Sequence, residues 1–530
     1  MKNNKEEQIK APWMRPMMNI EKDMEFNEDG YLEKAPEIEK EIFLVTEKEV
    51  ANTINPNILD HKSVLAVLLN ELKGIDFYQR ASLKSGEKIN DRHFVIISNE
   101  EILNTAKRNY WSLCMSDGFL YVFNGAYWKQ LSLSDLKSFL GQAAEKLGVP
   151  TYDARYHNFR NDLYKQFVSS AYLPRPERKG NEVLINLKNG TFVISPEKQY
   201  LNPFERADFL TYQLQFDYDE KMQASLFQKY LDKVLPDGEQ QKVLAEYIGY
   251  VFVKQKVLKL EKALVLYGGG ANGKSVFFDI INALLGSENI CNYTLESLTN
   301  SSGYQRAMLS DKLLNYASEI SPKMDSTLFK QLVSGEPVEA RLPYKEPFLL
   351  RDYAKFIFNT NILPKDVEQN VAFFRRFMLI NFNVTIPEDE RDPMLASKII
   401  ENELPGVFNW VLDGLKRLLT NRNFTPSKAI ENAISEYRLQ SDSVQFFLEE
   451  EGYVPDSGHE ITLKEFYGNY KQYCGDTGCR ACSRKNFAER MRNLKFEIWR
   501  KSSGYVIGIV KIVFEQTTFP TSNTLIDTIK

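Results

Sequence analysis

The stretch that most clearly suggests chemistry is GGGANGKS, residues 268–275, where Gly268 and Gly273 flank four residues and Lys274 and Ser275 follow. Glycines let a backbone curl so that its N–H groups wrap a phosphate, and the start of a following helix favours an anion. Lys274 can then reach the β- and γ-phosphates of ATP, while the Ser275 hydroxyl coordinates Mg²⁺. The residues of this predicted nucleotide-binding loop are Gly268, Gly269, Gly270, Ala271, Asn272, Gly273, Lys274, Ser275 and Val276.

The segments on both sides of the loop predict the elements that would position it. Residues 263–267 are an apolar run typical of a short, buried parallel strand. After the loop, apolar residues fall on one helical face, namely Val276, Phe277, Ile280, Ile281, Leu284 and Leu285. Because a strand, the loop and a helix in this order are the setting that phosphate binding requires, we favour it over an ordinary glycine-rich turn.

A carboxylate that can activate water is expected at the end of a neighbouring strand. Residues 313–317 predict a second buried strand, and Glu319 follows it in the sequence KLLNYASEIS. An acid at this edge of a parallel sheet can hold the Mg²⁺ shell and polarise the attacking water. Glu319 is therefore the predicted catalytic base and metal ligand, and the alternative is an ordinary exposed glutamate.

Two later motifs could act on the γ-phosphate. AKFIFNTNILP predicts a strand that ends in amides, of which Asn361 is the better candidate and Asn359 the lesser for hydrogen bonding the γ-phosphate and water. AFFRRFMLINF places Arg375 and Arg376 between apolar segments at a strand entrance. In a ring of subunits such an arginine can reach the next subunit's γ-phosphate, and we expect Arg376 to do so, the alternative being a surface ion pair.

The order of these motifs resembles that of the superfamily 3 helicases, and most closely the phage, plasmid and poxvirus primase-helicase group. The series is GGGANGKS, NYASEIS, LFKQLVSGEPVEARLPYKEPFLL, FIFNTN and FRRF. ELPGVFNWVLDGLKRLL resembles that group's helical segment after the ATPase core, and INLKNGTFVI resembles its N-terminal accessory domain. The likeness covers about residues 96–515. Many members carry paired acids on the second strand, whereas Ser318 precedes Glu319 here, so Glu319 would have to serve both metal and water.

The resemblance implies a hexameric AAA+ ring that hydrolyses ATP, translocates on single-stranded DNA and separates a duplex at a replication fork. In the family, the segment between the acid strand and the amide strand forms a hairpin in the ring's channel. Its basic candidates here are Lys330, Arg341 and Lys345, with Gly335 allowing a turn. Glutamates between them keep a merely solvated hairpin as the alternative.

The C-terminal region is basic, with eight Lys or Arg residues against two Glu between Arg480 and Lys501. SRKNFAERMRNL predicts a helix with Ser483 as N-cap. Residues Phe487, Met491 and Leu494 form its core face, and Arg484, Lys485 and Arg492 lie outside. With the strands predicted in KFEIWR and GYVIGIVKIVF, this indicates a winged helix that contacts DNA, or else a solvated helical face.

At 530 residues the chain should hold several domains. We expect an α/β fold with a partly flexible N-terminal region of unassigned role (1–95), a mixed α/β accessory domain (96–235), an AAA+ ATPase with a parallel sheet (236–425) and a winged helix (426–530). Hairpins are predicted around Asn124–Gly125 and Asn189–Gly190. A net charge of −4 means that any nucleic-acid surface must be local.

The start MKNNKEEQIK lacks an apolar signal region, and the sequence has no run of about 18 uncharged apolar residues. We therefore expect a cytoplasmic protein of a bacterial or phage-infected cell, with no membrane partner. Five cysteines make no disulfide framework. We discount zinc at Cys474, Cys479 and Cys482, since the second half of a paired knuckle is missing. We also interpret Asp217 and Asp219 as a solvated turn rather than a primase metal site.

The sequence thus predicts an ATP-dependent DNA helicase that acts in replication of a phage, plasmid or integrated element. Expected partners are single-stranded and forked DNA, further copies of the chain in a hexamer, and a separate primase or other replication proteins. The alternatives are a nucleotide-gated initiator or loader that binds or melts origin DNA, and a bifunctional primase-helicase. A small-molecule P-loop kinase is disfavoured because Arg375 and Arg376 would have no clear role in it.

Overall fold

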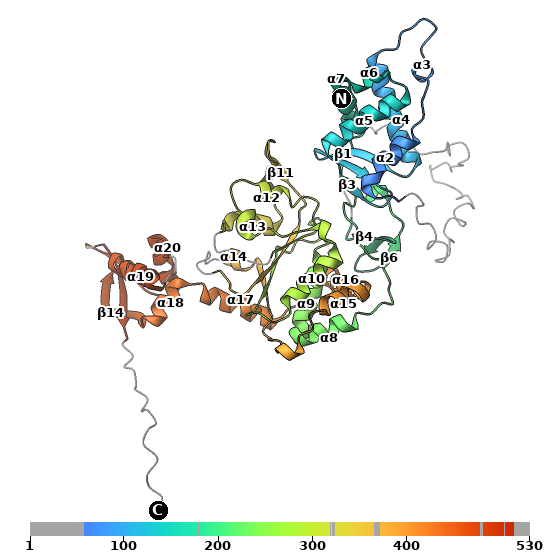
Figure 1. The fold of residues 1–530 in the computed structure, drawn as a ribbon. Coiled ribbons are helices and arrows are strands. Elements are labelled where there is room, and N and C mark those ends of the chain that lie inside the picture. Colours follow the sequence, from blue (N-terminus) through green and yellow to red (C-terminus); the bar gives the residue numbers. More distant parts are fainter. Residues whose placement is uncertain are drawn as a thin grey trace, which may run out of the picture. The chain divides into compact units, whose positions relative to one another are not determined.

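The structure is a computed structural model that describes residues 58–176, 180–317, 320, 324–364, 371–477, 481–502 and 504–512. All of these residues belong to the same one of the two units into which the chain divides. Figure 1 shows their helices and strands. The flexible N-terminal arm expected from the sequence falls outside the described ranges. The α/β fold class is confirmed, because the unit contains a five-stranded sheet whose neighbouring strands all pair in parallel.

The first part of this unit packs helices on a small antiparallel sheet. Its elements are α2 (His61–Glu71), α3 (Phe77–Arg80), α4 (Asp91–Arg108), β1 (Ser112–Ser116), β2 (Phe119–Phe123), β3 (Trp128–Gln130), α5 (Leu133–Leu147), α6 (Thr151–Arg155) and α7 (His157–Ser170). Strands β2 and β3 confirm the hairpin predicted around Asn124–Gly125. The Asn124 side chain stabilises that turn by accepting hydrogen bonds from the amides of Ala126 and Tyr127, at 3.0 and 2.9 Å. The helices before residue 95 share one apolar core with the later ones.

A second antiparallel sheet follows, with strands β4 (Val183–Leu187), β5 (Gly190–Ile194) and β6 (Gln199–Asn202), and then the short helix η3 (Arg206–Asp208). The hairpin predicted around Asn189–Gly190 is confirmed by the pairing of β4 with β5. Gly190 has a φ of +150°, and a Cβ there would lie 2.5 Å from the carbonyl oxygen of Asn202, so the close approach of β6 requires glycine. The inner residues Ile185 and Phe192 join the core of the next part.

The parallel sheet has the strand order β13–β7–β12–β9–β8. Its strands are β7 (Ala263–Tyr267), β8 (Ile290–Cys291), β9 (Leu314–Ala317), β12 (Lys355–Thr360) and β13 (Phe377–Asn381). The helices around it are α8 (Ser225–Val234), α9 (Gly238–Tyr250), α10 (Lys274–Leu285), η4 (Ser287–Asn289), α11 (Leu295–Leu298), α12 (Tyr304–Ala307), α13 (Ser326–Ser334), α14 (Val371–Phe374), η5 (Glu388–Glu390), α15 (Leu395–Asn402), α16 (Leu404–Asn421) and α17 (Lys428–Gln440). A short hairpin of β10 (Val338–Ala340) and β11 (Phe348–Leu350) is separate from this sheet.

Both faces of the parallel sheet are covered, which explains its nearly continuous apolar strands. Alternate residues of β7 enter two different cores, Leu264 and Leu266 on one face and Ala263 and Val265 on the other. Helices α9, α10 and α16 cover the first face, while α12 and α13 lie on the other side (Figure 1). The strands are thereby fixed on both sides, so the loops at their ends are held in place by the packing.

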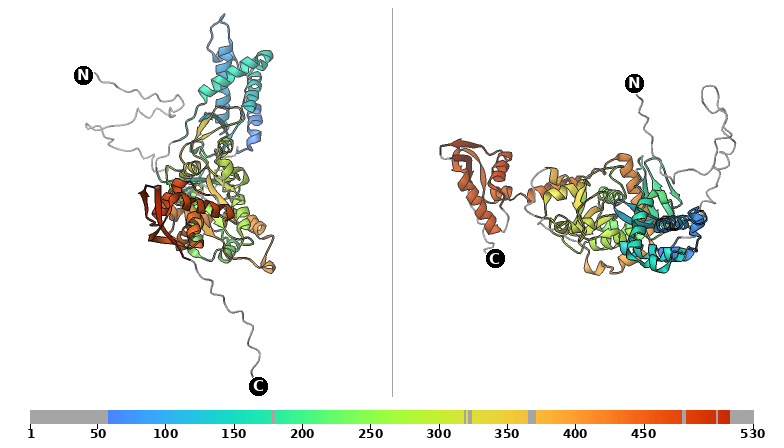
Figure 2. Two further views of the ribbon diagram at one scale, coloured as in Figure 1. Left: turned by 90° about the vertical axis from the view of Figure 1, so that its left-hand side faces the viewer. Right: turned by 90° about the horizontal axis from the view of Figure 1, so that it is seen from above.

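The C-terminal part has its own small core. Its elements are α18 (Ser443–Glu450), β14 (Tyr453–Thr462), α19 (Leu463–Thr477), α20 (Arg484–Asn493), β15 (Ile498–Lys501) and β16 (Gly504–Lys511). The three helices pack on the antiparallel sheet β14–β16–β15 (Figure 2). This confirms the helix and the two terminal strands predicted here. Within the described ranges of the chain, we find no helix with the length and apolar character needed to span a membrane.

Candidate functional site

The predicted phosphate loop joins β7 to α10, as the sequence indicated. Its backbone turns through left-handed conformations, with φ values of +106° at Gly270, +50° at Ala271 and +86° at Gly273. A Cβ at Gly268 would lie 2.3 Å from both the Asn272 amide nitrogen and the Phe382 carbonyl oxygen, so glycine is sterically required there. A Cβ at Gly269 would meet nothing within 4 Å. The loop is therefore anchored at its start and open along its crest, a shape that fits a phosphate chain.

The side chains of the loop hold it in this shape. Lys274 is buried, and its Nζ donates hydrogen bonds to the carbonyl oxygen of Gly268 at 2.7 Å and to Oδ1 of Asn272 at 3.1 Å. Asn272 Nδ2 donates in turn to the Phe382 carbonyl oxygen at 2.9 Å. Burial lowers the pKa of the Lys274 ammonium, because removal from water disfavours its charge. The hydroxyl of Tyr230, on α8, donates to the Gly273 carbonyl oxygen at 2.8 Å, and Ser275 is exposed.

The carboxyl edge of the sheet brings Asn361 to this loop. Thr360, at the end of β12, pairs with Tyr267, and its carbonyl oxygen accepts a hydrogen bond from the Gly268 amide at 3.3 Å. Asn361 follows directly and is exposed, so it lies beside the start of the loop. Asn359 is buried instead, with its Oδ1 accepting from the Tyr316 hydroxyl at 3.1 Å. The amide exposed at the loop is therefore the one that the sequence favoured.

Glu319 lies outside the described residues, so its predicted role stays a prediction. Strand β9, which precedes it, ends at Ala317, and Ala317 pairs with Phe358 on β12. The chain therefore leaves β9 at the same edge of the sheet at which β7 enters the phosphate loop.

Arg375 and Arg376 lie at the amino ends of the parallel strands, whereas Lys274 follows the carboxyl end of β7. The Ala263 amide, at the start of β7, donates to the Arg376 carbonyl oxygen at 2.8 Å, whereas the loop begins after Tyr267 at the other end. Five strand residues separate the two ends, roughly 16 Å at about 3.3 Å per residue. The structure therefore does not bring the arginine pair together with the phosphate loop of its own chain.

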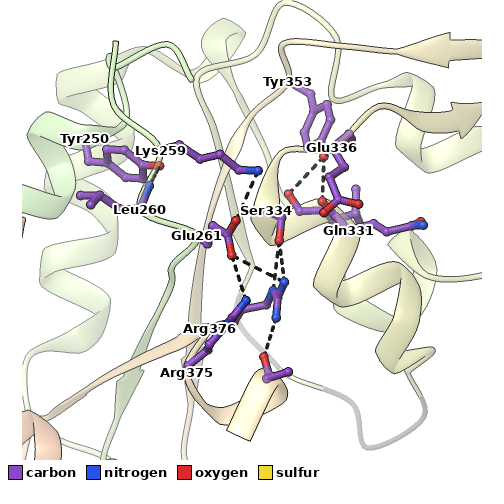
Figure 3. Close-up of polar contacts among 12 residues, drawn as sticks. Tyr250, Lys259, Leu260, Glu261, Gln331, Ser334, Glu336, Tyr353, Arg375 and Arg376 are labelled. Carbon is purple, nitrogen blue, oxygen red and sulfur yellow. Dashed lines mark hydrogen bonds and ion pairs between the residues drawn. The ribbon is translucent and has the colours of Figure 1, made fainter. Parts of the chain in front are cut away.

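The two arginines differ sharply in their surroundings (Figure 3). The Arg376 side chain is 9% exposed, and its Nε and Nη2 donate to Ser334 Oγ at 3.1 and 2.8 Å. Its Nη1 donates to the Ala372 carbonyl oxygen at 2.6 Å. Arg375 is 59% exposed, and the Glu261 carboxylate lies 3.6 Å from the guanidinium of each arginine. The arginine that the sequence favoured is thus the more deeply held of the two.

The expected hairpin is present, but it is shorter than the segment assigned to it. Gly335 does not turn the hairpin: with a φ of +66° it caps α13. Lys330 lies on α13, half buried, and not on the hairpin formed by β10 and β11. Arg341 and Lys345 are exposed in its loop, where Arg341 Nε donates to the Lys345 carbonyl oxygen at 3.1 Å.

Tyr344, at the tip of this loop, was missed by the sequence reasoning. It is fully exposed and has a φ of +60°, which is unusual for a residue that carries a side chain. An exposed ring between basic residues is a surface on which a nucleic-acid base can stack. The signal was an aromatic residue in LPYKEP, a polar, proline-flanked stretch that would not bury it.

The C-terminal basic residues lie on α20. Ser483 is its N-cap, with Oγ accepting from the Asn486 amide, and Phe487 and Met491 are buried, as predicted. Arg484, Lys485 and Arg492 are all exposed. Arg490, by contrast, pairs with Asp442 at 3.2 Å. The helix therefore presents a local basic surface on a chain whose net charge is negative.

Two of the cysteines discounted as zinc ligands, Cys474 and Cys482, belong to the C-terminal core, and Cys479 is outside the described residues. His459, the histidine upstream of them, pairs with Asp456 at 2.7 Å. Asp217 and Asp219 are exposed in an irregular segment. Among the residues that the structure describes, no three His, Cys, Asp or Glu side chains are grouped in a way that could hold a metal ion.

Two family models match parts of the chain. Residues 100–236 match a model described as D5 N terminal like, which supports the resemblance of this region to the accessory domain of the phage-type primase-helicases. Residues 266–376 match a family of unknown function, DUF5906. That match runs from β7 through the phosphate loop to Arg376, so it contains every candidate catalytic residue.

The fold is also similar to solved structures of the NrS-1 C terminal region. The A form apo structure has 13% sequence identity and a TM-score of 0.44, covering 77% of this chain and 98% of that chain. The apo structure of its residues 305–718 has 14% identity and a TM-score of 0.42, covering 80% of this chain and 100% of that chain.

Proposed function

We propose that this chain is an ATP-dependent DNA helicase of superfamily 3, which assembles as a hexameric ring and translocates on single-stranded DNA during replication of a phage, plasmid or integrated element. One observation carries the proposal: the phosphate loop and the arginine pair lie at opposite ends of the parallel strands. Because the Arg376 backbone is anchored at the amino end of the strand whose other end enters the phosphate loop, we propose that this guanidinium completes the nucleotide site of another copy of the chain.

In this proposal the phosphate loop and the residues around it bind ATP and activate water. The amides along the open crest receive the phosphates, and Lys274 exchanges its contacts with Gly268 and Asn272 for the β- and γ-phosphates. Ser275 and Glu319 would hold Mg²⁺, which would neutralise charge at those phosphates when bound. Glu319 accepts the proton of the attacking water, and Asn361, exposed at the loop, orients that water and the γ-phosphate.

The neighbouring subunit contributes the last charge. Arg376 reaches the γ-phosphate across the subunit boundary and stabilises the negative charge that develops on the transferred oxygens. A hexamer follows from the family resemblance and would contain six such shared sites. The D5-like match supports the same family for the preceding region.

DNA contacts fall on two surfaces. The hairpin of β10 and β11 offers Arg341 and Lys345 for phosphates and Tyr344 for stacking, a combination that grips a strand without reading its sequence. Lys330 lies on α13, the helix leading into this hairpin. The α20 surface of Arg484, Lys485 and Arg492 is a second contact in what we propose is a winged helix.

The test is ATP hydrolysis by the full chain with and without single-stranded DNA, together with displacement of a labelled strand from a forked duplex. We expect DNA-stimulated turnover and strand displacement, both abolished by Lys274→Ala and unaffected by Lys416→Ala, an exposed lysine on α16. Turnover without displacement would overturn the helicase in favour of an initiator or loader. Turnover that survives Lys274→Ala would overturn the site itself.

A further inference from the structure

Ser334, the last residue of α13, is the main partner of the Arg376 side chain (Figure 3). It is buried, and its hydroxyl oxygen accepts the two hydrogen bonds from Arg376 Nε and Nη2. With the Ala372 carbonyl oxygen and the Glu261 carboxylate, three separate elements hold this one guanidinium. Hydrogen bonds from a charged donor in a buried site are among the stronger ones in proteins.

Arg376 therefore cannot reach another subunit in the described conformation. Its side chain is 9% exposed, and every contact named above would have to break before the guanidinium could extend. We define this arrangement, with Arg376 on Ser334 and Glu261, as the retracted state. Action in trans requires a second, extended state, so the contacts of the retracted state control how often the arginine is available.

The end of α13 that carries this serine is also hydrogen-bonded to the hairpin of β10 and β11. Gly335 ends α13, and its amide donates to the carbonyl oxygens of Gln331 and Leu332. The Tyr353 hydroxyl lies 2.8 Å from the Glu336 carbonyl oxygen and 3.1 Å from that of Leu332. Glu336 precedes β10 and Tyr353 follows β11, so this one O–H, shared between carbonyl oxygens of α13 and Glu336, lies where both ends of the hairpin meet the end of α13 (Figure 3).

Building on the function proposed above, we infer that Ser334 is a positioning residue that holds Arg376 retracted until DNA binds the hairpin. A strand that displaces the hairpin also displaces the end of α13, which weakens the hold of Ser334 on Arg376 and frees the arginine for the next subunit's ATP. By linkage, an arginine drawn to a neighbouring γ-phosphate loosens the hairpin by the same free energy. Ser334 thus couples DNA contact to ATP turnover.

The test compares ATP turnover of the full chain with and without single-stranded DNA for Ser334→Ala and Glu261→Gln. Each change removes one hold on the retracted arginine and leaves Arg376 intact. We expect Ser334→Ala, which removes both hydrogen bonds from Arg376, to raise DNA-free turnover about 30-fold, with little change in the DNA-saturated rate. Glu261→Gln should also raise the ratio of DNA-free to DNA-saturated turnover, but by a smaller factor. Thr327→Ala, an exposed change on the same helix, should behave as wild type.

Two results together would overturn the inference and leave Ser334 a structural residue. The first is that Ser334→Ala loses turnover with and without DNA and melts at a lower temperature. The second is that Glu261→Gln keeps the wild-type ratio of DNA-free to DNA-saturated turnover. An unchanged ratio in both variants would overturn it as well. The double variant Ser334→Ala with Arg376→Ala distinguishes the role of Ser334 from the proposed shared site. If Ser334 acts through Arg376, the gain in DNA-free turnover must disappear in the double variant. If Arg376→Ala alone leaves turnover intact, the proposed shared site itself is wrong.

Discussion

The amide of Ala263 donates a hydrogen bond to the carbonyl oxygen of Arg376 at 2.8 Å, which fixes the arginine at the amino edge of the strand whose other end becomes the phosphate loop. One strand therefore connects the two halves of the proposed catalytic machinery and keeps them apart. Under the proposed function, a site that needs both halves forms between two chains.

The first prediction concerns the start of the phosphate loop. Gly268→Ala should lower the melting temperature of the nucleotide-free chain and weaken ATP binding, because the new Cβ meets a backbone carbonyl and the Asn272 amide at 2.3 Å. Overpacking of this kind costs about 1–3 kcal/mol. Gly269→Ala is the matched control, since a Cβ there meets nothing within 4 Å. Equal melting temperatures for the two variants would contradict the described loop.

The second prediction concerns the hairpin tip. Tyr344→Ala should weaken binding to single-stranded DNA by about 1–3 kcal/mol, the range for loss of one stacked base, while Tyr344→Phe should keep the affinity. Because the side chain is fully exposed, neither change should alter the melting temperature. Titration of a labelled oligonucleotide measures the affinity. If both variants bind like wild type, Tyr344 is simply a solvated residue.

The third prediction concerns α20. Replacing Arg484, Lys485 and Arg492 together by alanine should lower affinity for duplex DNA and flatten its salt dependence, because phosphate contacts release counterions. DNA-free ATP turnover should not change. Lys464→Ala with Lys471→Ala removes exposed charges from α19 and is the control. An equal loss of affinity in the control would point to general attraction rather than to a contact surface on α20.

The fourth prediction uses Lys355, whose ammonium lies 4.3 Å from the centroid of the Tyr250 ring. Burial lowers the pKa of Lys355 from 10.5 to about 8, although Asp352 acts in the opposite direction. The unfolded chain therefore binds more protons than the folded chain between these values, so this group makes stability rise with pH across that window. Below pH 8 the lysine is charged in both states, and its burial in the charged form opposes folding.

Lys355→Met should accordingly be more stable than wild type at pH 7, and the difference in melting temperature should shrink as the pH rises toward 10. The comparison with wild type at each pH cancels the titration of other groups. A difference that stays constant from pH 7 to pH 10 would show that Lys355 keeps its ordinary pKa in the folded chain.

Much of the fold could be predicted because the local signals were strong. The run at residues 263–267, the glycines of the loop and the apolar face of α10 each agree with one arrangement, and packing on both faces reinforced it. The two hairpins followed from Asn-Gly turns, where local conformation decides the pairing.

The rest depended on contacts between distant residues. Gly335 was expected to turn a hairpin, yet it caps α13, because a glycine permits either use and only the packing of α13 decides. Sequence separation also hid the pairing of Arg376 with Ser334, 42 residues away, and so could not distinguish the buried arginine from the exposed one. Tyr344 was overlooked because exposure is a property of the folded hairpin.

The most direct test of the shared site is complementation between two inactive variants. Lys274→Ala lacks the phosphate-binding lysine and Arg376→Ala lacks the arginine, so neither should hydrolyse ATP alone. Mixed one to one and allowed to exchange subunits, they should recover about a quarter of the wild-type turnover, since about one interface in four would combine an intact lysine with an intact arginine. No recovery after proven subunit exchange, or full activity of Arg376→Ala alone, would contradict a site built from two chains.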